Sequence, residues 1–259
     1  MSDDNLAFTI SEHQDYTEED DMVVKRKTHT LEIGLESGKL DITFPSGESL
    51  VFDSVQFHAH APSEHTVDGE FHDLEIHFVH THPDGDKFAV IGVFFDVGQY
   101  ENPFIAQLGF ELAEEEENTI GAVDVATFLE EIDTENYWHY DGSFTTPPCT
   151  EGVKFFVMKE VQSISQDQLD AFHSYSWGNG DFENGEGNNR RTQPLNDRTL
   201  YNISASGADE GESEEGEGAN GEAEGEGATE ESGESNGGNN NVDISIAFNV
   251  DVGQKNADE

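Results

Sequence analysis

The chain has 259 residues, enough for one substantial hydrophobic core, and carries 57 acidic against 11 basic residues for a formal net charge of −46. That charge argues against nucleic acid or an anionic membrane surface as a partner, since both would repel it. No run of about 18 apolar residues occurs, so no membrane span is predicted, and Cys149 is alone, which excludes an internal disulfide.

Strand signals dominate the first part of the chain. Residues rich in β-branched and aromatic side chains, separated by turns of Gly, Pro and Asp, predict strands over 28–35, 39–44, 54–60, 73–80, 88–97 and 153–158. Short helices are predicted over 101–114, 125–132 and 165–175. The pattern is typical of a mainly β fold, with a central, largely antiparallel twisted sheet and a few short peripheral helices.

Composition divides the chain into three parts. Residues 1–202 hold nearly all of the aromatic side chains and predict a single folded domain. Residues 203–241 are rich in Gly and Glu, with no aromatic side chain and no Lys or Arg, and predict a disordered acidic segment. Residues 242–252 alternate apolar with smaller or polar side chains. This last pattern, within a terminal part over 242–259, predicts either a strand that joins the main sheet or a tail that is only partly ordered.

Histidines recur inside two of the predicted strands. Gln56, His58 and His60 share one face of the first strand, because side chains at every second position point the same way. A turn near residues 67–71 would return a second strand, on which Glu75 and His77 share a face. Three imidazoles can then converge, and three neutral nitrogen ligands suit zinc with one position left open. Gln56 and Glu75 could accept the second ring N–H of their neighbouring histidines.

A second metal site fits the same residues. The pattern H-x-H-x3-E, formed by His58, His60 and Glu64, also matches the first half of the cupin metal motif. Glu64 would then be a metal ligand, and the metal could be iron or manganese. Residues elsewhere in the chain are needed to separate the two alternatives.

Longer motifs separate them. The stretches QFHAH (56–60), SEHTVDGEFHDLEIHFVH (63–80), FAVIGVFF (88–95), YWHYDGSFTTPPCTEGVKF (137–155) and NNRRTQPLNDR (188–198) together resemble an α-class carbonic anhydrase. The resemblance runs from about Leu6 to Tyr201. It implies a mainly antiparallel sheet with zinc in a conical cleft, and reversible hydration of CO2 to bicarbonate and a proton.

The resemblance also implies roles for matching positions. Zinc would be held by His58, His60 and His77. Thr145 would orient the attacking hydroxide and pass its own proton to Glu64. Gln56, Glu75 and Asn188 would support the zinc ligands from behind. Thr146, Val79, Val90 and Phe144 would contact the substrate. His65 and Tyr140 would make structural hydrogen bonds.

His29 is the candidate proton shuttle. Its H-T-L context resembles the strand from which members of this family pass protons out of the cleft, and the pKa of an ordinary histidine suits that task near neutral pH. The alternative is an exposed histidine in a basic turn, since it follows Lys25, Arg26 and Lys27.

The sequence departs from the family pattern in four places. The segment that carries the family's Q-S-P-I motif is absent, and Cys149 stands where secreted relatives have one half of a disulfide. Phe155 replaces a tryptophan at the floor of the cleft, and Arg191 replaces a proline. The position of Cys149 and the secreted habit of similar proteins favour an exported protein whose leader is missing from this sequence, with a cytoplasmic location as the alternative.

Two other functions remain open. The chain could be a catalytically silent relative that acts as a binding module. It could also be an acidic secreted matrix protein that supplies bicarbonate while its Glu-rich segment binds Ca2+ weakly. For the enzyme, the expected partners are the small molecules CO2 and bicarbonate, and a monomer is expected with an oligomer left open.

Overall fold

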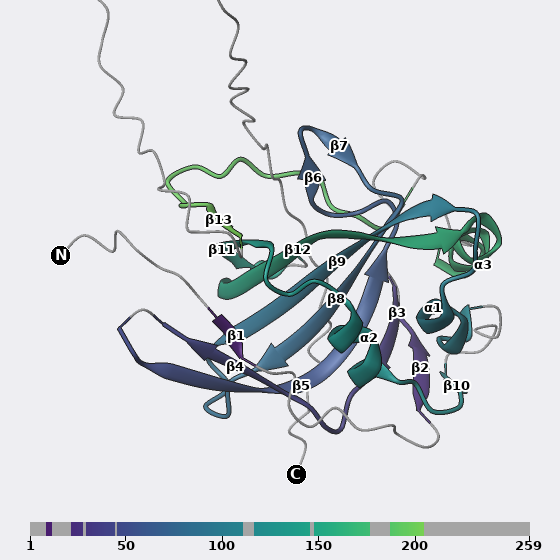
Figure 1. Cartoon of the computed structure of the whole chain (residues 1–259). Coiled ribbons are helices and arrows are strands. Elements are labelled where there is room, and N and C mark those ends of the chain that lie inside the picture. The colour runs from purple at the N-terminus through teal and green to yellow at the C-terminus, as the bar shows by residue number, and fades with distance from the viewer. Residues whose placement is uncertain are drawn as a thin grey trace, which may run out of the picture.

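The computed structural model describes residues 9–11, 22–27, 30–44, 46–110, 117–145, 148–176 and 187–204. An eleven-stranded sheet runs through this part of the chain, in the order β10-β2-β3-β5-β8-β9-β12-β11-β13 (Figure 1). The order gives nine of the eleven strands, and the other two lie beside β5, where β4 pairs with β5 and β1 pairs with β4. In chain order the strands of this sheet are β1 (Thr9–Ser11), β2 (Val23–Arg26), β3 (Leu31–Gly34), β4 (Lys39–Thr43), β5 (Ser49–His60), β8 (Leu74–Thr81), β9 (Phe88–Gly98), β10 (Glu117–Thr119), β11 (Tyr137–Ser143), β12 (Glu151–Ser165) and β13 (Tyr201–Ile203).

The strand directions confirm the predicted fold class. Of the described pairings, β9 with β12 is parallel and the others are antiparallel. Within the described ranges three short helices accompany the sheet, namely α1 (Pro103–Gln107), α2 (Val125–Glu131) and α3 (Gln166–Ser176). No helix among the described residues is both long enough and apolar enough to cross a membrane.

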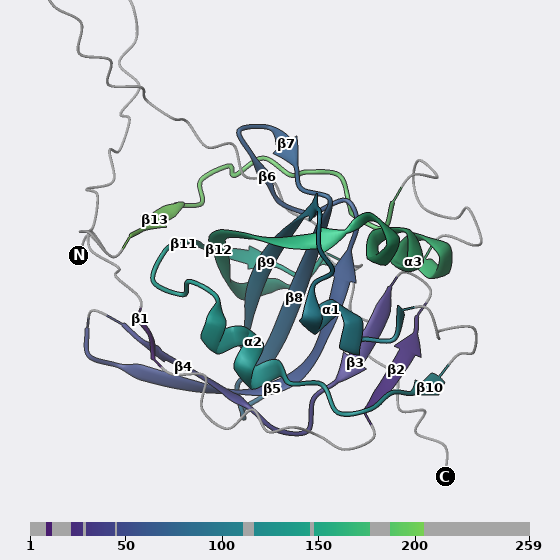
Figure 2. The ribbon, with the colours of Figure 1, turned by 45° about the vertical axis from the view of Figure 1, so that its right-hand side comes forward.

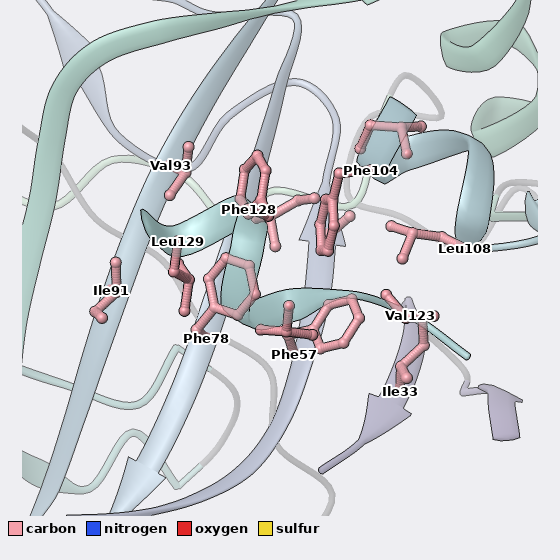
Figure 3. Packing of buried hydrophobic residues seen from close by; sticks show 14 of the residues in the cluster. Ile33, Phe57, Phe78, Ile91, Val93, Phe104, Leu108, Val123, Phe128 and Leu129 are labelled. Atoms are coloured by element: carbon pink, nitrogen blue, oxygen red, sulfur yellow. The ribbon is translucent and has the colours of Figure 1, made fainter. Parts of the chain in front are cut away.

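Helices α1 and α2 cover one face of the sheet (Figure 2). Beneath them Phe57 of β5 and Phe78 of β8 stack at a centroid distance of 5.3 Å, and Phe104 of α1 stacks on Phe128 of α2 at 4.1 Å (Figure 3). All four rings belong to one buried cluster. Burying a phenylalanine stabilises a fold by about 1.5–3 kcal/mol, so this cluster is a main source of the sheet's stability.

The same cluster decides which face carries the histidines. Phe57 and Phe78 are directly paired across β5 and β8, and the next pair along the two strands is His58 with His77. A slip of one residue would bring the imidazoles into the apolar core and the phenyl rings out of it. The energy of the aromatic core therefore fixes both the register and the position of the histidines.

A tight hairpin connects β5 to β8, at the turn that the sequence predicts. Strands β6 (Thr66–Val67) and β7 (Glu70–Phe71) form a separate two-stranded sheet. Asp68 and Gly69, between them, have φ angles of +53° and +82°. Two consecutive positive φ angles are typical of a type I′ turn, for which Asp-Gly is a preferred pair.

Helix α1 is shorter than its prediction over 101–114. It begins after Asn102, whose side-chain oxygen accepts hydrogen bonds from the backbone N–H of Phe104 and Ile105. It ends before Gly109, whose φ of +62° is left-handed and cannot continue a helix. The glycine therefore stops the helix inside the predicted segment. Helices α2 and α3 agree with their predictions to within one residue at each end.

Strand β11 is missing from the sequence prediction, and β12 is much longer than predicted. Strand β11 has no alternation to find, because Tyr137–Tyr140 are all buried. Strand β12 runs on to Ser165 through polar residues, and its register against β9 shifts between Val157 and Val161. The polar composition of the second half of β12 therefore explains why the sequence did not predict it as a strand.

The described residues end at Ser204. The predicted acidic segment past that point and the predicted strand over 242–252 lie outside them. The three-part division of the chain, with a boundary at 202, stays a prediction.

Candidate metal centre

Three buried histidines lie together on the sheet face opposite α1 and α2. His58 and His60 belong to β5, and His77 of β8 is paired with His58. Their ring centroids are 4.9, 5.0 and 5.4 Å apart in the three pairs. One nitrogen from each ring lies within 4.8 Å of the others, and none of the three residues is more than 2% exposed. The structure therefore brings together the three histidines that the sequence analysis selects.

Hydrogen bonds fix which nitrogen of each ring carries the proton. His58 Nδ1 lies 2.9 Å from Gln56 Oε1, and His60 Nδ1 lies 3.3 Å from the carbonyl oxygen of Asn188. His77 Nε2 lies 2.8 Å from Glu75 Oε1. Because each partner oxygen accepts, each of these nitrogens donates a proton. The nitrogen with a lone pair is thus Nε2 in His58 and His60, and Nδ1 in His77.

These lone pairs fit a zinc ion. The Nε2 atoms of His58 and His60 are buried without a hydrogen-bond partner in the described part of the chain. Leaving such an acceptor unsatisfied costs roughly 1–3 kcal/mol, which a bound cation would offset. Three neutral nitrogen ligands are the set that catalytic zinc sites use. His58, His60 and His77 would hold the metal.

The electrostatics keep two of the rings neutral. Burial, followed by the neighbouring His60 and His77, holds the pKa of His58 well below its ordinary value. Burial and His77 lower the pKa of His60 to about 3. Neutral imidazole is the form that binds a metal, so both residues are ready to bind zinc at neutral pH without first losing a proton.

Glu75 anchors the rear of this group. Its Oε1 accepts from His77 Nε2 at 2.8 Å and from His65 Nδ1 at 2.6 Å, and its Oε2 accepts from the backbone N–H of Glu64 and His65. Burial opposes ionisation, but the rings of His65 and His77 hold the pKa of Glu75 well below its usual range. The carboxylate is therefore charged and bound on both oxygens.

Tyr140 completes the network behind Glu75. Its hydroxyl lies 2.9 Å from His65 Nε2, and burial raises the pKa of this phenol well above its usual value. The phenol therefore keeps its proton and donates to His65, which in turn donates to Glu75. The two residues expected to make structural hydrogen bonds lie behind the metal centre.

Glu64 and Thr145 form a second buried pair beside the histidines. Glu64 Oε1 accepts the backbone N–H of Arg190 at 3.2 Å and lies 3.4 Å from His60 Nδ1. Burial, followed by the Glu75 carboxylate, raises the pKa of Glu64 well above its usual value, although the Arg190 N–H and the Thr145 hydroxyl act in the opposite direction. The contact between Thr145 Oγ1 and Glu64 nevertheless falls short of ordinary hydrogen-bond geometry within the described residues. Both side chains are at least nine-tenths buried.

Residues 187–190 lie against the end of β5 and hold it. Asn188 uses its side chain to accept from Ala61 N at 2.8 Å and to donate to the carbonyl oxygen of Ala59 at 2.9 Å, and its own carbonyl binds His60. The sequence analysis expects Asn188 near the ligands but misses the backbone contact from Arg190 to Glu64. A backbone N–H carries no side-chain signal, so only the fold could reveal it.

The three apolar residues expected around the substrate lie next to one another. Val79 and Val90 are directly paired across β8 and β9 and are buried in one cluster, against which Phe144 packs. Phe144 also meets Phe88 edge to face, at a centroid distance of 4.5 Å. His29 and Thr146 lie outside the described residues.

Three of the four departures from the family pattern are substitutions at described residues, and they affect the site unequally. Phe155 is fully buried and stacks on Tyr140 with an interplanar angle of 9°, so it fills the position of the larger ring with an aromatic contact. Cys149 is a free, half-buried thiol with a φ of +57°. Arg191 is exposed. Of these three residues, Phe155 also meets the ring of His77 edge to face, at a centroid distance of 6.3 Å.

Another group of potential ligands, His82, Asp84 and Asp86, lies in the turn between β8 and β9. The two carboxylates are exposed, and His82 Nδ1 already accepts from Asp84 N at 3.3 Å. A third group, His65, Glu75 and His77, is buried like the first and shares His77 with it, but its two rings already donate to the Glu75 carboxylate.

The chain belongs to the eukaryotic-type carbonic anhydrases, whose family pattern matches residues 2–204. The expected resemblance is confirmed. By fold and by family the chain therefore belongs with the carbonic anhydrases and not with the cupins, the alternative in which Glu64 would be a metal ligand.

Curated relatives and solved structures agree with this family. The chain is 36% identical over 175 residues to a carbonic anhydrase of Klebsiella pneumoniae, covering 66% of this chain and 65% of that protein. It is 43% identical over 122 residues to alpha carbonic anhydrase 4 of Arabidopsis thaliana, covering 46% of this chain and 44% of that protein. The chain thus spans about half to two thirds of the length of these relatives.

Two solved structures are similar over most of the described fold. The alpha-carbonic anhydrase of Thermovibrio ammonificans, in complex with the inhibitor sulfanilamide, gives a TM-score of 0.60 at 33% identity over 77% of this chain and 82% of that one. A dioscorin complexed with ascorbate gives a TM-score of 0.62 at 28% identity over 76% of this chain and 79% of that one. The same fold therefore occurs in complexes with two different small molecules.

Proposed function

We propose that this protein catalyses the reversible hydration of CO2 to bicarbonate and a proton, with zinc held by His58, His60 and His77. The observation that most supports the proposal is the convergence of three buried imidazole lone pairs next to Glu64. When bound, zinc supplies Lewis acidity, which generates a nucleophile from water at neutral pH.

Thr145 and Glu64 would orient that nucleophile. In this proposal the Thr145 hydroxyl donates its proton to Glu64, so its oxygen can only accept a proton from the attacking group. The attacking group must then direct a lone pair, rather than its proton, towards CO2. The backbone N–H of Arg190 holds Glu64 in place for this task.

The apolar wall would hold the substrate. Val79, Val90 and Phe144 offer hydrocarbon and an aromatic ring, and no polar side-chain group. CO2 has no dipole and competes poorly with water for polar groups, so an apolar surface next to the histidines favours its binding. Thr146 would contribute on the bicarbonate side.

Removal of the metal tests the proposed function. Dialysis of the full chain against a strong chelator should abolish CO2 hydration measured by stopped flow, and stoichiometric zinc should restore it. Mg2+ and Ca2+ should not restore it, because these hard cations prefer oxygen ligands. A metal-free protein that remains folded and retains full activity would refute the proposal.

His29 gives a second test within the same function. Release of a proton to water limits the fastest turnover unless a group near pKa 6.5 relays it. At saturating CO2 in dilute buffer, His29→Ala should lower kcat severalfold with kcat/KM nearly unchanged, and added imidazole should restore kcat. An unchanged kcat in dilute buffer would assign His29 to the surface instead.

A binding function is the second candidate. The similarity to a dioscorin complexed with ascorbate shows that this fold can accommodate another small molecule. This alternative predicts a zinc-loaded protein with no measurable CO2 hydration. The matrix function rests on the acidic segment, and Ca2+ titration of the full chain against a chain lacking residues 207–240 would test it.

A further inference from the structure

We propose that Gly92 is a positioning residue for the metal centre and acts through Glu75. The inference rests on the proposed zinc site. Gly92 lies on β9, directly opposite His77 of β8 on one side and Val157 of β12 on the other. A Cβ atom at position 92 would lie 2.8 Å from Glu75 Oε1, closer than a carbon and an oxygen can approach without one of them moving.

The other two neighbours would tolerate a methyl group. The same Cβ would lie 3.6 Å from His77 Cδ2 and 3.7 Å from Val157 Cγ2, which are ordinary van der Waals distances. The conflict is therefore confined to one carboxylate oxygen. A glycine inside a strand often marks a close approach of this kind.

A glutamate side chain usually moves aside at little cost, but Glu75 is held. Its two oxygens accept four N–H groups: the His65 and His77 rings on Oε1, and the backbone N–H of Glu64 and His65 on Oε2. Any shift of the carboxylate weakens the bond that fixes the ring of His77. The absence of a side chain at Gly92 thus leaves the space in which Glu75 orients a metal ligand.

The neighbouring residues on β9 support this reading. Val90 and Phe94 lie two positions to either side of Gly92, share its face of the strand, and are fully buried apolar side chains. An apolar side chain at position 92 would match this pattern, were it not for the carboxylate. The break in the pattern coincides with the position opposite His77.

The test is a double-mutant cycle on zinc affinity, measured by chelator competition on the full chain. Gly92→Ala should weaken zinc binding by roughly 10–100-fold, the range for loss of an outer hydrogen-bond partner of a ligand. In a Glu75→Ala background, where the oxygen is gone, the same change should alter affinity by no more than about twofold. Gly34→Ala is the matched control, because a Cβ at Gly34 of β3 meets nothing within 4 Å.

Two outcomes of the cycle would overturn the inference. One is wild-type zinc affinity in Gly92→Ala, and the other is an equal loss in both backgrounds, which would indicate a general packing effect. If the wild-type chain binds no zinc, the proposed function fails by itself.

A second measurement does not need the metal or the Glu75 variant. In the metal-free protein, the ring N–H protons of His65 and His77 that bind Glu75 should give low-field NMR signals. Gly92→Ala should shift both signals and speed their exchange with water, while Gly34→Ala should leave them in place. Unchanged signals in a folded Gly92→Ala protein would contradict the proposed role of Gly92.

Discussion

Replacing His58, His60 or His77 by alanine is expected to abolish zinc binding and CO2 hydration together. Each variant removes one of the three buried imidazoles that are proposed to bind zinc. The loss of zinc affinity should exceed about 100-fold, the upper end for loss of an outer-shell partner alone. Metal content of the purified protein and stopped-flow hydration rates measure the two effects.

His82→Ala is the matched control for these variants. His82 belongs to a separate group of potential ligands, in the turn between β8 and β9, where its two carboxylate neighbours are exposed. This variant should keep both zinc and activity. Full activity in any one of the three ligand variants, or loss of zinc in His82→Ala, would place the metal elsewhere.

Thr145→Ala should separate metal binding from catalysis. The variant should keep its zinc, because Thr145 is not among the ligands, and should lose roughly 100-fold in kcat, the scale of a lost oriented hydrogen bond in an active site. Thr145→Ser keeps a hydroxyl and should retain most of the activity. Glu64→Gln should resemble Thr145→Ala, since the single amide oxygen would be occupied by the Arg190 N–H and the NH2 group would donate towards Thr145 instead of accepting from it.

A different result would change the assignment of this pair. Loss of zinc from Glu64→Gln would make Glu64 a ligand and revive the cupin-like geometry. Equal activity of Thr145→Ala and the wild type would remove the threonine from the mechanism. Zinc analysis alongside the rates distinguishes these outcomes.

Much of the fold followed from local sequence. Alternation along β5 and β8 placed Phe57 and Phe78 on one face and the histidines on the other, because side chains on a strand repeat every two residues. The Asp68-Gly69 turn was predictable for an equally local reason, since only a few residue pairs adopt positive φ twice. Strand β11 was missed because its buried residues show no alternation.

Parts of the site depend on contacts that are distant in sequence or are made by the backbone. The Asn188 carbonyl reaches His60 across 128 residues, and the Arg190 N–H reaches Glu64 across 126. No spacing rule links such segments. The placement of Glu75 between two imidazoles, and the space that Gly92 leaves for it, appear only when β8 and β9 lie side by side.

Diffraction from crystals of the zinc-loaded chain, recorded on both sides of the zinc absorption edge, tests the central claim most directly. We expect one anomalous peak, from a zinc ion bound by Nε2 of His58, Nε2 of His60 and Nδ1 of His77. Each zinc–nitrogen distance should be about 2.0–2.1 Å, with no protein atom in the fourth position. A peak bound by the Glu64 carboxylate, or one located at His82 and Asp84, would contradict the account.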